Sequence, residues 1–211
     1  MPSAVTLKGR FGHLEKLSAS RVASGCWSAV KDRPELWTYV FYGPFPDEHA
    51  FFNFVSEIEQ SEDPCYYAIF DRDGRACGWA SLMRIQPAAR VIEVGSIVYA
   101  PALQRTPLAT EVQYLLARYV FEILGYRRYE WKCDALNARS RRAAERFGFT
   151  FEGIFKQHMI VKGRNRDTAW FAMLDSEWPR VKAAFERWLD PGNFGEDGHQ
   201  RRSLEEIRNT L

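Results

Sequence analysis

The chain has 211 residues, of which 46% are hydrophobic and 15% aromatic, so it can bury the core of one large domain and is not intrinsically disordered. Its formal net charge of +2 does not indicate a nucleic-acid or membrane partner. No apolar run approaches the ~20 residues that cross a bilayer, and Met1–Leu17 lacks the apolar stretch of a secretory signal. We therefore expect a soluble, cytoplasmic protein.

The first part of the chain predicts two helices around an extended connector. Met1–Lys16 shows few signals of order, and a helix is expected over Ser20–Lys31. The segment Tyr39–Pro46 predicts an extended connector, because a proline biases the residue before it away from the helical conformation. Asp47 can cap a following helix. The apolar stripe of that helix consists of Phe51, Phe54, Val55 and Ile58.

An antiparallel meander is expected next. The segments Cys65–Phe70 and Arg75–Met83 are rich in residues that favour strands, and the turn signal Asp71–Gly74 joins them. Pro87–Arg90 forms a second turn, and Val91–Tyr99 is the third strand.

After Pro107 the apolar residues follow a helical spacing, which predicts a long helix up to Ile123. We then expect a strand over Arg128–Cys133, a helix over Ala138–Arg146 and an extended segment over Phe149–Val161. A turn over Lys162–Asn165 leads to a last strand over Thr168–Leu174. A helix from Asp175 to about Leu189 follows, and the tail contains at most a short helix over Ser203–Asn209. This order predicts one α/β or α+β domain over residues 1–190 and a carboxy-terminal extension over residues 191–211.

The cysteines do not indicate a metal site. Cys26, Cys65, Cys77 and Cys133 are scattered, without a C-x-x-C pair or an H-E-x-x-H sequence, and a metal site needs clustered ligands. We expect four reduced thiols that pack in the interior and no bound metal. A catalytic cysteine is the less favoured alternative, because free cysteine usually serves as a small apolar residue.

The start of the long helix is a candidate anion site. Thr106 can cap this helix, and Pro107 fits its first position, where an N–H would lack an intrahelical partner. The free amides that follow lie at the positive end of the helix dipole, and Arg105 adds a full charge. These amides belong to Leu108, Ala109 and Thr110. An ordinary capped helix is the alternative interpretation of this segment.

Two motifs in order carry a family resemblance. Gln104–Ala109 follows the pattern Q-x-x-(G)-x-A between a strand and a helix, and Asn137–Phe149 follows N-x-x-S-x-R-x-x-E-x-x-G-F. Together they resemble the acetyl-CoA motifs of the GNAT superfamily, most closely the branch of ribosomal-protein N-terminal acetyltransferases of the Rim type. The resemblance runs from about Leu7 to Trp178 and is most specific across Ile92–Phe149.

The resemblance implies a fold and a cosubstrate. The fold is of the α/β (α+β) class, with a mixed, largely antiparallel central sheet and helices on both faces, as one GNAT-like domain over residues 1–190. The cosubstrate is acetyl-CoA. The positions that match the family's cofactor residues are Ile97, Val98 and Tyr99 for the pantetheine arm, and Gln104, Arg105, Thr106, Leu108, Ala109 and Thr110 for the pyrophosphate. Asn137 matches a residue that binds the pantetheine or acetyl region, and Ser140 matches a hydroxyl near the sulfur or the 3′ neighbourhood of CoA. The N–H of Val98 is expected to polarise the thioester carbonyl.

The sequence departs from the family pattern at two positions. Pro107 stands where the family prefers glycine, and it removes both a donor and backbone freedom. Ala144 stands where many members carry a tyrosine that protonates the departing thiolate, and alanine has no proton to give.

A reaction of this type is the direct attack of a neutral amine on the thioester, which requires a base and an acid. Glu93 is the candidate base, because partial burial in an apolar strand raises the pKa of a carboxyl. Its alternative is a structural carboxylate paired with Arg84 or Lys132. Ser140 is the candidate acid near the sulfur, or it merely completes the first turn of a helix capped by Asn137. Asp134 is a weaker candidate base or a turn residue.

Other polar and aromatic groups have both a functional and a structural interpretation. The turn Lys162–Asp167 can bind an acidic group of the acceptor or only confer solubility. The arginines around Ser140 can reach a phosphate or form a solvated helix face, and His158 is expected to be structural. We expect at least three of four tryptophans to lie in the core. These are Trp37, Trp79, Trp131 and Trp170.

The favoured function is an N-acetyltransferase whose acceptor is a primary amine of a small molecule, an aminoacyl compound or a protein amino terminus. A non-catalytic acyl-CoA-binding module is the alternative, because of Pro107 and Ala144. A nucleic-acid-binding protein that uses Arg139–Arg146 is disfavoured by the near-neutral charge. A homodimer formed through the carboxy-terminal segment is conceivable.

Overall fold

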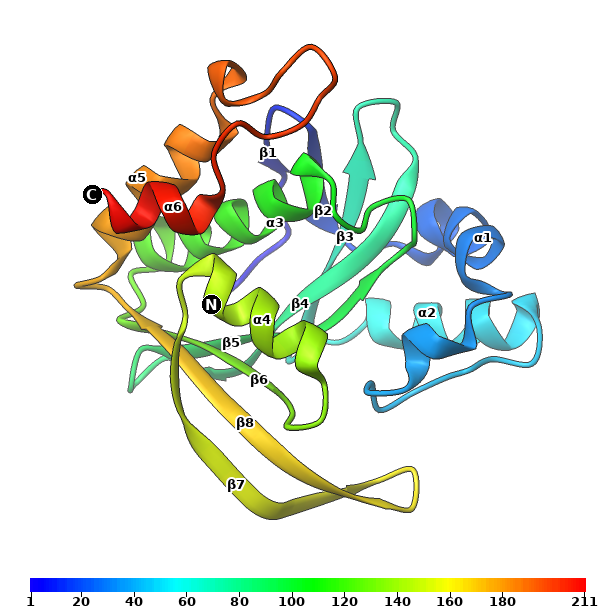
Figure 1. Cartoon of the computed structure of the whole chain (residues 1–211). Coiled ribbons are helices and arrows are strands. Elements are labelled where there is room, and N and C mark those ends of the chain that lie inside the picture. Colours follow the sequence, from blue (N-terminus) through cyan, green and yellow to red (C-terminus); the bar gives the residue numbers. More distant parts are fainter.

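Eight strands form one sheet in the order β1-β2-β3-β4-β5-β6-β8-β7 (Figure 1). The computed structural model describes every residue from Met1 to Leu211. The strands are β1 (Leu7–Lys8), β2 (Gly12–Lys16), β3 (Cys65–Asp71), β4 (Ala76–Gln86), β5 (Val91–Tyr99), β6 (Arg128–Asp134), β7 (Thr150–Val161) and β8 (Arg164–Leu174). All neighbours are antiparallel except β5 and β6, which are parallel.

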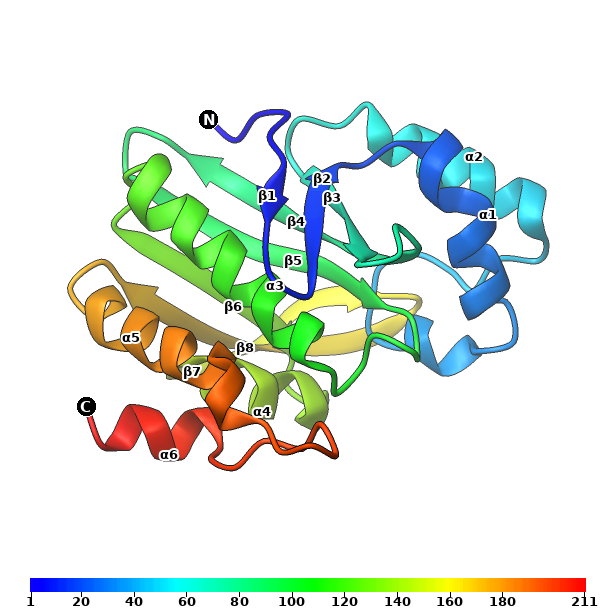
Figure 2. The ribbon, with the colours of Figure 1, turned by 90° about the horizontal axis from the view of Figure 1, so that it is seen from above.

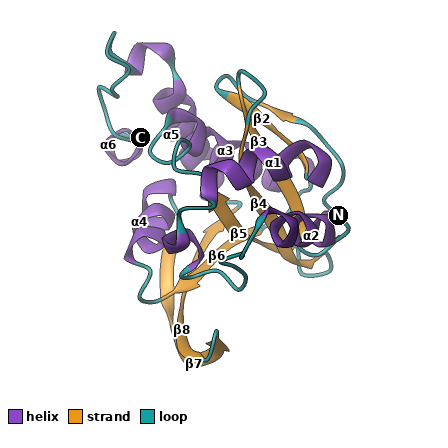
Figure 3. Cartoon of the chain, turned by 90° about the vertical axis from the view of Figure 1, so that its right-hand side faces the viewer, coloured by secondary structure: helices purple, strands orange, loops and turns teal.

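Helices cover both faces of this sheet (Figures 2 and 3). The main helices are α1 (Ala19–Val30), α2 (Glu48–Glu59), α3 (Pro107–Arg118), α4 (Ala138–Phe147), α5 (Trp178–Leu189) and α6 (Leu204–Asn209). Side chains of α3, α4, α5 and α6 share one core cluster with Ile92 and Val94 of β5. Side chains of α1 and α2 form a second cluster with Trp79 of β4 and Val98. The predicted fold class is therefore confirmed.

Three short turns of other helix types complete the chain. η1 (Pro34–Trp37) and η3 (Pro191–Asn193) are 3-10 turns, and η2 (Tyr119–Ile123) is a π-helical turn that prolongs α3. No helix in the structure is both long enough and apolar enough to span a bilayer.

The amino terminus is more ordered than the sequence indicated. Met1–Lys16 contains β1 and β2, and β2 pairs along its whole length with β3. An added Cβ at Gly12 would lie 2.1 Å from the carbonyl oxygen of Phe70 and 2.8 Å from the side chain of Leu108. Glycine is therefore needed for this close approach. With Leu14 as the single large buried residue of β2, the alternating pattern was too short to predict a strand.

The last strand also begins earlier than expected. Lys162 and Gly163 have φ values of +51° and +73°, so these two residues alone make the hairpin turn. Arg164 then already pairs with Val161, and Arg166 pairs with Met159. The predicted turn over Lys162–Asn165 is thus too long, and its Arg164 and Asn165 lie in β8.

The carboxy-terminal segment packs against the rest of the chain. Leu204 and Ile207 are only 1% and 3% exposed and belong to the same core cluster as α3. Arg208 donates hydrogen bonds from its two terminal nitrogens to the carbonyls of Glu145 (3.0 Å) and Arg146 (2.7 Å) at the end of α4. Residues 191–211 therefore share the core of the preceding residues and hold the end of α4.

Candidate active site

A groove begins where two neighbouring strands separate. β5 and β6 pair over only four residues each, with Val91–Val94 of β5 opposite Arg128–Trp131 of β6. Beyond this point β5 stays with β4, whereas β6 stays with β8. A groove of about 1420 Å³ is lined by residues from both sides of the divergence. Because β6 has moved away, one edge of β5 has no strand partner along the groove.

A β-bulge decides which backbone groups of β5 face this groove. The β4–β5 register passes from Ser81 opposite Gly95 to Trp79 opposite Val98, so β5 holds one extra residue. Ser96 in the bulge has a φ of +47°. The hydroxyls of Tyr42 and Tyr66 donate to its carbonyl and to its Oγ, each at 3.4 Å.

The backbone of β5 alternates after the bulge. The N–H of Ala100 donates to the carbonyl of Cys77 on β4 at 2.9 Å. Because backbone groups alternate along a strand, those of Val98 also point to β4, and those of Ile97 and Tyr99 point to the open edge. The expectation that the N–H of Val98 polarises a carbonyl in the groove is therefore wrong.

The start of α3 offers fewer free amides than expected. Thr106 caps the helix, and its Oγ1 accepts from the N–H of Ala109 at 3.3 Å. The Ala109 amide is therefore not free. The N–H of Leu108 donates to no group of the chain, although its side chain is buried in the core and does not line the groove. Arg105 is exposed on the groove next to this amide.

Gln104 and Tyr99 connect the end of β5 to α3. The side-chain Nε2 of Gln104 donates to the carbonyl of Tyr99 at 3.0 Å, and Gln113 donates to the Tyr99 hydroxyl at 2.7 Å. Burial raises the pKa of Tyr99 above its ordinary range. The phenol is therefore a structural contact rather than a proton donor in the groove.

On the opposite wall, α4 begins beside the groove. Asn137 caps α4, and its Oδ1 accepts from the N–H of Ser140 at 3.1 Å. Ser140 Oγ accepts from the indole N–H of Trp131 at 2.9 Å. Both Asn137 and Ser140 line the groove while they complete the first turn of the helix. Ala144 is fully buried, so this position supplies no group to the groove.

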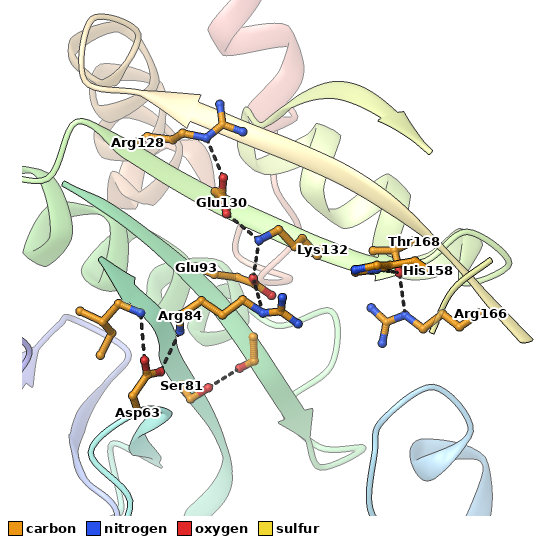
Figure 4. A network of polar contacts seen from close by, with 12 residues as sticks. Asp63, Ser81, Arg84, Glu93, Arg128, Glu130, Lys132, His158, Arg166 and Thr168 are labelled. Atoms are coloured by element: carbon orange, nitrogen blue, oxygen red, sulfur yellow. Dashed lines mark hydrogen bonds and ion pairs between the residues drawn. The ribbon is translucent and has the colours of Figure 1, made fainter. Parts of the chain in front are cut away.

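Glu93 lies at the centre of a chain of ion pairs on the sheet face that carries α1 and α2 (Figure 4). Its Oε2 is 2.9 Å from Lys132 Nζ and 3.2 Å from Arg84 Nε. Lys132 also contacts Glu130 at 2.6 Å and lies 4.0 Å from the centre of the Trp170 ring. Glu93 Oε1 accepts no hydrogen bond from the chain. The structural pairing with Arg84 and Lys132 is thus present, and it leaves one oxygen of the carboxylate free.

The pKa of Glu93 reflects two opposed causes. Burial raises it above the ordinary value of 4.5, and the nearby Lys132 and Arg84 counteract part of this rise. The net direction is upward, which makes the carboxylate a stronger base than an exposed glutamate.

A second bulge aims Arg84 at Glu93. Arg84 has a φ of +50° where the β4–β5 register shifts between Met83 and Gln86. The two oxygens of Asp63 accept from the N–H groups of Arg84 (2.7 Å) and Ile85 (3.1 Å). Asp63 therefore fixes the strand conformation from which Arg84 reaches the carboxylate.

The groove brings together eleven of the twelve candidate residues, and Leu108 is the exception. Those that line it are Glu93, Ile97, Val98, Tyr99, Gln104, Arg105, Thr106, Ala109, Thr110, Asn137 and Ser140. Residues from β5, α3 and α4 that are far apart in the sequence thus face one space.

Comparison with known proteins fits this geometry. A model of the GNAT acetyltransferase domain matches residues 20–150. The crystal structure of a GCN5-related N-acetyltransferase from Brucella melitensis is 48% identical, covers 99% of this chain and 96% of that chain, and has a TM-score of 0.96. The chain belongs to the GNAT acetyltransferase family. The resemblance drawn from Gln104–Ala109 and Asn137–Phe149 is thereby confirmed.

Two further relatives extend this comparison. A structure described as "a probable acetyltransferases (GNAT family)" from Chromobacterium violaceum ATCC 12472 is 40% identical, with a TM-score of 0.80, and covers 84% of this chain and 90% of that chain. The "Putative ribosomal N-acetyltransferase YdaF" from Bacillus subtilis (strain 168) is 30% identical over 110 residues. That match spans 52% of this chain and 60% of the Bacillus protein.

Other predicted groups of this acetyltransferase have mainly structural contacts. Trp37, Trp79 and Trp131 are buried, as expected for at least three of the tryptophans. Asp134 Oδ1 accepts from the N–H of Leu136 at 2.9 Å, as a turn residue does. His158 is not isolated, because its Nδ1 contacts Thr168 Oγ1 at 2.9 Å beside Arg166.

Sequence reasoning did not single out Arg166 of this acetyltransferase. The sequence places it in a turn that either confers solubility or binds an acidic group, whereas in the structure it is 7% exposed and lines the groove. An Arg-x-Arg pair just after a two-residue turn is the available signal, because alternation then places both side chains on one face of the strand.

Proposed function

We propose that this acetyltransferase binds acetyl-CoA in the groove between β5 and β6 and transfers the acetyl group to a primary amine, with Glu93 as the base. The observation that supports the proposal is a buried carboxylate with one free oxygen that lines the same groove as an unpaired strand edge and a helix amino terminus. The acceptor is an amine of a small molecule, an aminoacyl compound or a protein amino terminus.

The residues of the groove fit acetyl-CoA. The backbone groups of Ile97 and the N–H of Tyr99 suit the amides of a pantetheine arm, as one strand pairs with another, while the Tyr99 carbonyl already accepts from Gln104. The free N–H of Leu108 and the guanidinium of Arg105 suit a phosphate at the start of α3. Pro107 removes no intrahelical hydrogen bond there, since it occupies the first helical position. When bound, acetyl-CoA supplies an acetyl group that is already activated as a thioester.

Glu93 and Ser140 are the groups of this chain that can move protons. Glu93 Oε1 is free to accept the proton of an amine, while Lys132 and Arg84 hold Oε2 and fix the orientation of the carboxylate. Ser140 Oγ accepts the indole hydrogen of Trp131, so its own hydroxyl hydrogen can be donated, and the Cys133 sulfur competes for that hydrogen. In this proposal Ser140 therefore protonates the departing thiolate, the role that a tyrosine at the position of Ala144 has in many family members.

Replacing Ser140 with alanine tests this role. We expect kcat to fall by about 10²-fold, at the lower end of the range for an acid–base group, a larger change than any in the Kd for acetyl-CoA. Ser140→Thr keeps a hydroxyl and should retain most of the activity. A loss of thermal stability with kcat unchanged would show that the Ser140 hydroxyl only holds the indole of Trp131.

Calorimetric titration with acetyl-CoA tests the whole proposal, with desulfo-CoA and ATP as controls. Saturable and selective binding, followed by thiol release in the presence of an amine, is the expected result. Binding without turnover of any amine would favour a non-catalytic acyl-CoA-binding module. The absence of binding to any acyl-CoA would contradict the proposal.

A further inference from the structure

Arg166 is a buried cation without a counter-ion in the chain. It is 7% exposed and lines the groove. Its Nε donates to Thr168 Oγ1 at 3.2 Å, and its guanidinium lies 5.1 Å from the centre of the Phe41 ring. Its two terminal nitrogens donate to no group of the chain, and no carboxylate lies within the 4.0 Å of an ion pair. A buried and unpaired charge is unfavourable unless a ligand compensates it.

The neighbouring cations are already compensated. Lys132 contacts both Glu93 and Glu130. Arg164 lies 3.6 Å from Asp134, so it has a carboxylate partner. Arg84 uses its Nε toward Glu93, and its terminal nitrogens remain free. Figure 4 shows the guanidinium ends of Arg84 and Arg166 extending toward the same space.

The local electrostatic potential favours an anion in that space. Burial lowers the pKa of Arg166 and the charge of Arg84 adds to this effect, whereas Asp134, Cys133 and Glu93 counteract part of it from beyond ion-pair distance. Burial also lowers the pKa of His158, with contributions from Arg84 and Arg166. Because Arg166 donates to Thr168 Oγ1, the threonine hydroxyl can give its hydrogen to His158 Nδ1, and the imidazole stays neutral. An anion would therefore face two guanidinium groups.

The space is enclosed by the hairpin and the loop opposite. Lys162 Nζ donates to the carbonyls of Trp37 (2.7 Å) and Tyr42 (2.9 Å), which ties the tip of β7–β8 to that loop. Tyr39 and Phe41 of the same loop line the groove. The anion site is thus a walled part of the groove, and Glu93 lines the same groove.

We propose that Arg166, together with Arg84, binds a carboxylate carried by the acceptor, so that the acceptor is a carboxylate-bearing primary amine. A guanidinium offers two parallel N–H donors that match the two oxygens of a carboxylate. This inference rests on the proposed acetyl transfer and deepens it. A free amino acid and a peptide with an acidic side chain share this chemistry.

Matched amines that differ in one carboxylate test the inference. L-phenylalanine is compared with L-phenylalaninamide, which lacks the α-carboxylate. The dipeptide amide Ala-Glu-NH2 is compared with Ala-Gln-NH2, which lacks the side-chain carboxylate. Both comparisons are made at saturating acetyl-CoA. The screen extends to the other proteinogenic amino acids and their amides. One of the two kinds of pair contains the better acceptors. Within that kind, we expect the wild-type enzyme to have a kcat/KM on the order of 10- to 100-fold higher for the amine with the carboxylate than for its neutral partner, mainly because KM is lower. The two kinds of pair distinguish a free amino acid from an acidic peptide.

Variants on β8 locate the effect. Arg166→Met should remove the preference, because kcat/KM of the carboxylate member falls to about that of its neutral partner. Arg164→Met, two residues away in the same strand, should keep the preference. The wild-type pairs decide the question even if Arg166→Met does not fold.

Two outcomes overturn the inference while acetyl transfer stands. One is equal kcat/KM within the pairs, and the other is turnover of neutral or cationic amines with none of any carboxylate-bearing amine. The absence of both acetyl-CoA binding and thiol release would instead overturn the proposed function.

Discussion

Replacing Glu93 with glutamine is expected to lower kcat by about 10²- to 10⁴-fold, the usual contribution of a general base, while the Kd for acetyl-CoA stays unchanged. Glutamine keeps the size of the side chain but cannot accept the proton of an amine. Lys132 retains Glu130 as a partner, and Asp63 still holds the backbone of Arg84. The variant should therefore fold, and steady-state kinetics with calorimetry would measure both quantities.

Glu130→Gln is the matched control. Glu130 contacts the same Lys132 from the same sheet face, but it does not line the groove. We expect its kcat to stay close to that of the wild-type enzyme. An equal loss in both variants would indicate that the ion-pair chain matters for structure and that Glu93 is not the base.

The pH dependence of kcat/KM gives a second readout of Glu93. Its pKa in the folded protein is raised by burial, so activity should increase with pH through a value above 4.5 as the carboxylate loses its proton. Glu93→Gln should lack this acidic limb. A carboxyl whose pKa is higher in the folded protein than in the unfolded chain stabilises the fold at a pH below its unfolded-state pKa. This stabilisation is lost as the pH rises through the folded-state pKa. Near neutral pH the variant should therefore not lose stability through the missing charge, which thermal unfolding would check.

Local signals in the sequence predicted most of the fold. The turn Asp71–Gly74 and the apolar spacing after Pro107 led to β3, β4 and α3, because both depend on neighbours in the chain. The family motifs pointed to residues of β5, α3 and α4 that line one groove, apart from Leu108. The resemblance supplied this proximity, since spacing alone does not show which elements meet.

The remaining features depend on contacts between distant segments. The bulge at Ser96 is held by Tyr42 and Tyr66, which come from other elements, and no pattern within β5 reveals it. Arg166 contacts the ring of Phe41, which lies in a loop far from it in the sequence. Amino-acid type alone predicted a solvated arginine there, because arginine is mostly exposed unless tertiary packing covers it.

The bulge at Ser96 leads to the second large expected effect. Ser96→Val should lower the free energy of unfolding by about 1–3 kcal/mol, because a β-branched residue is strained at a φ of +47°. If the variant relieves this strain by removing the bulge, the alternation of β5 shifts by one residue. The backbone groups of Ile97 and Tyr99 would then leave the open edge, and affinity for acetyl-CoA should fall on the order of tenfold or more.

Ser96→Gly separates the conformation from the side chain. Glycine adopts a positive φ readily, so the bulge should persist although the hydrogen bond from Tyr66 is lost. We expect this variant to bind acetyl-CoA about as tightly as the wild-type enzyme, as measured by calorimetry. Weak binding by the valine variant with normal binding by the glycine variant would assign the effect to the backbone. Normal binding by both would mean that the bulge does not position the edge of β5 that receives the cosubstrate.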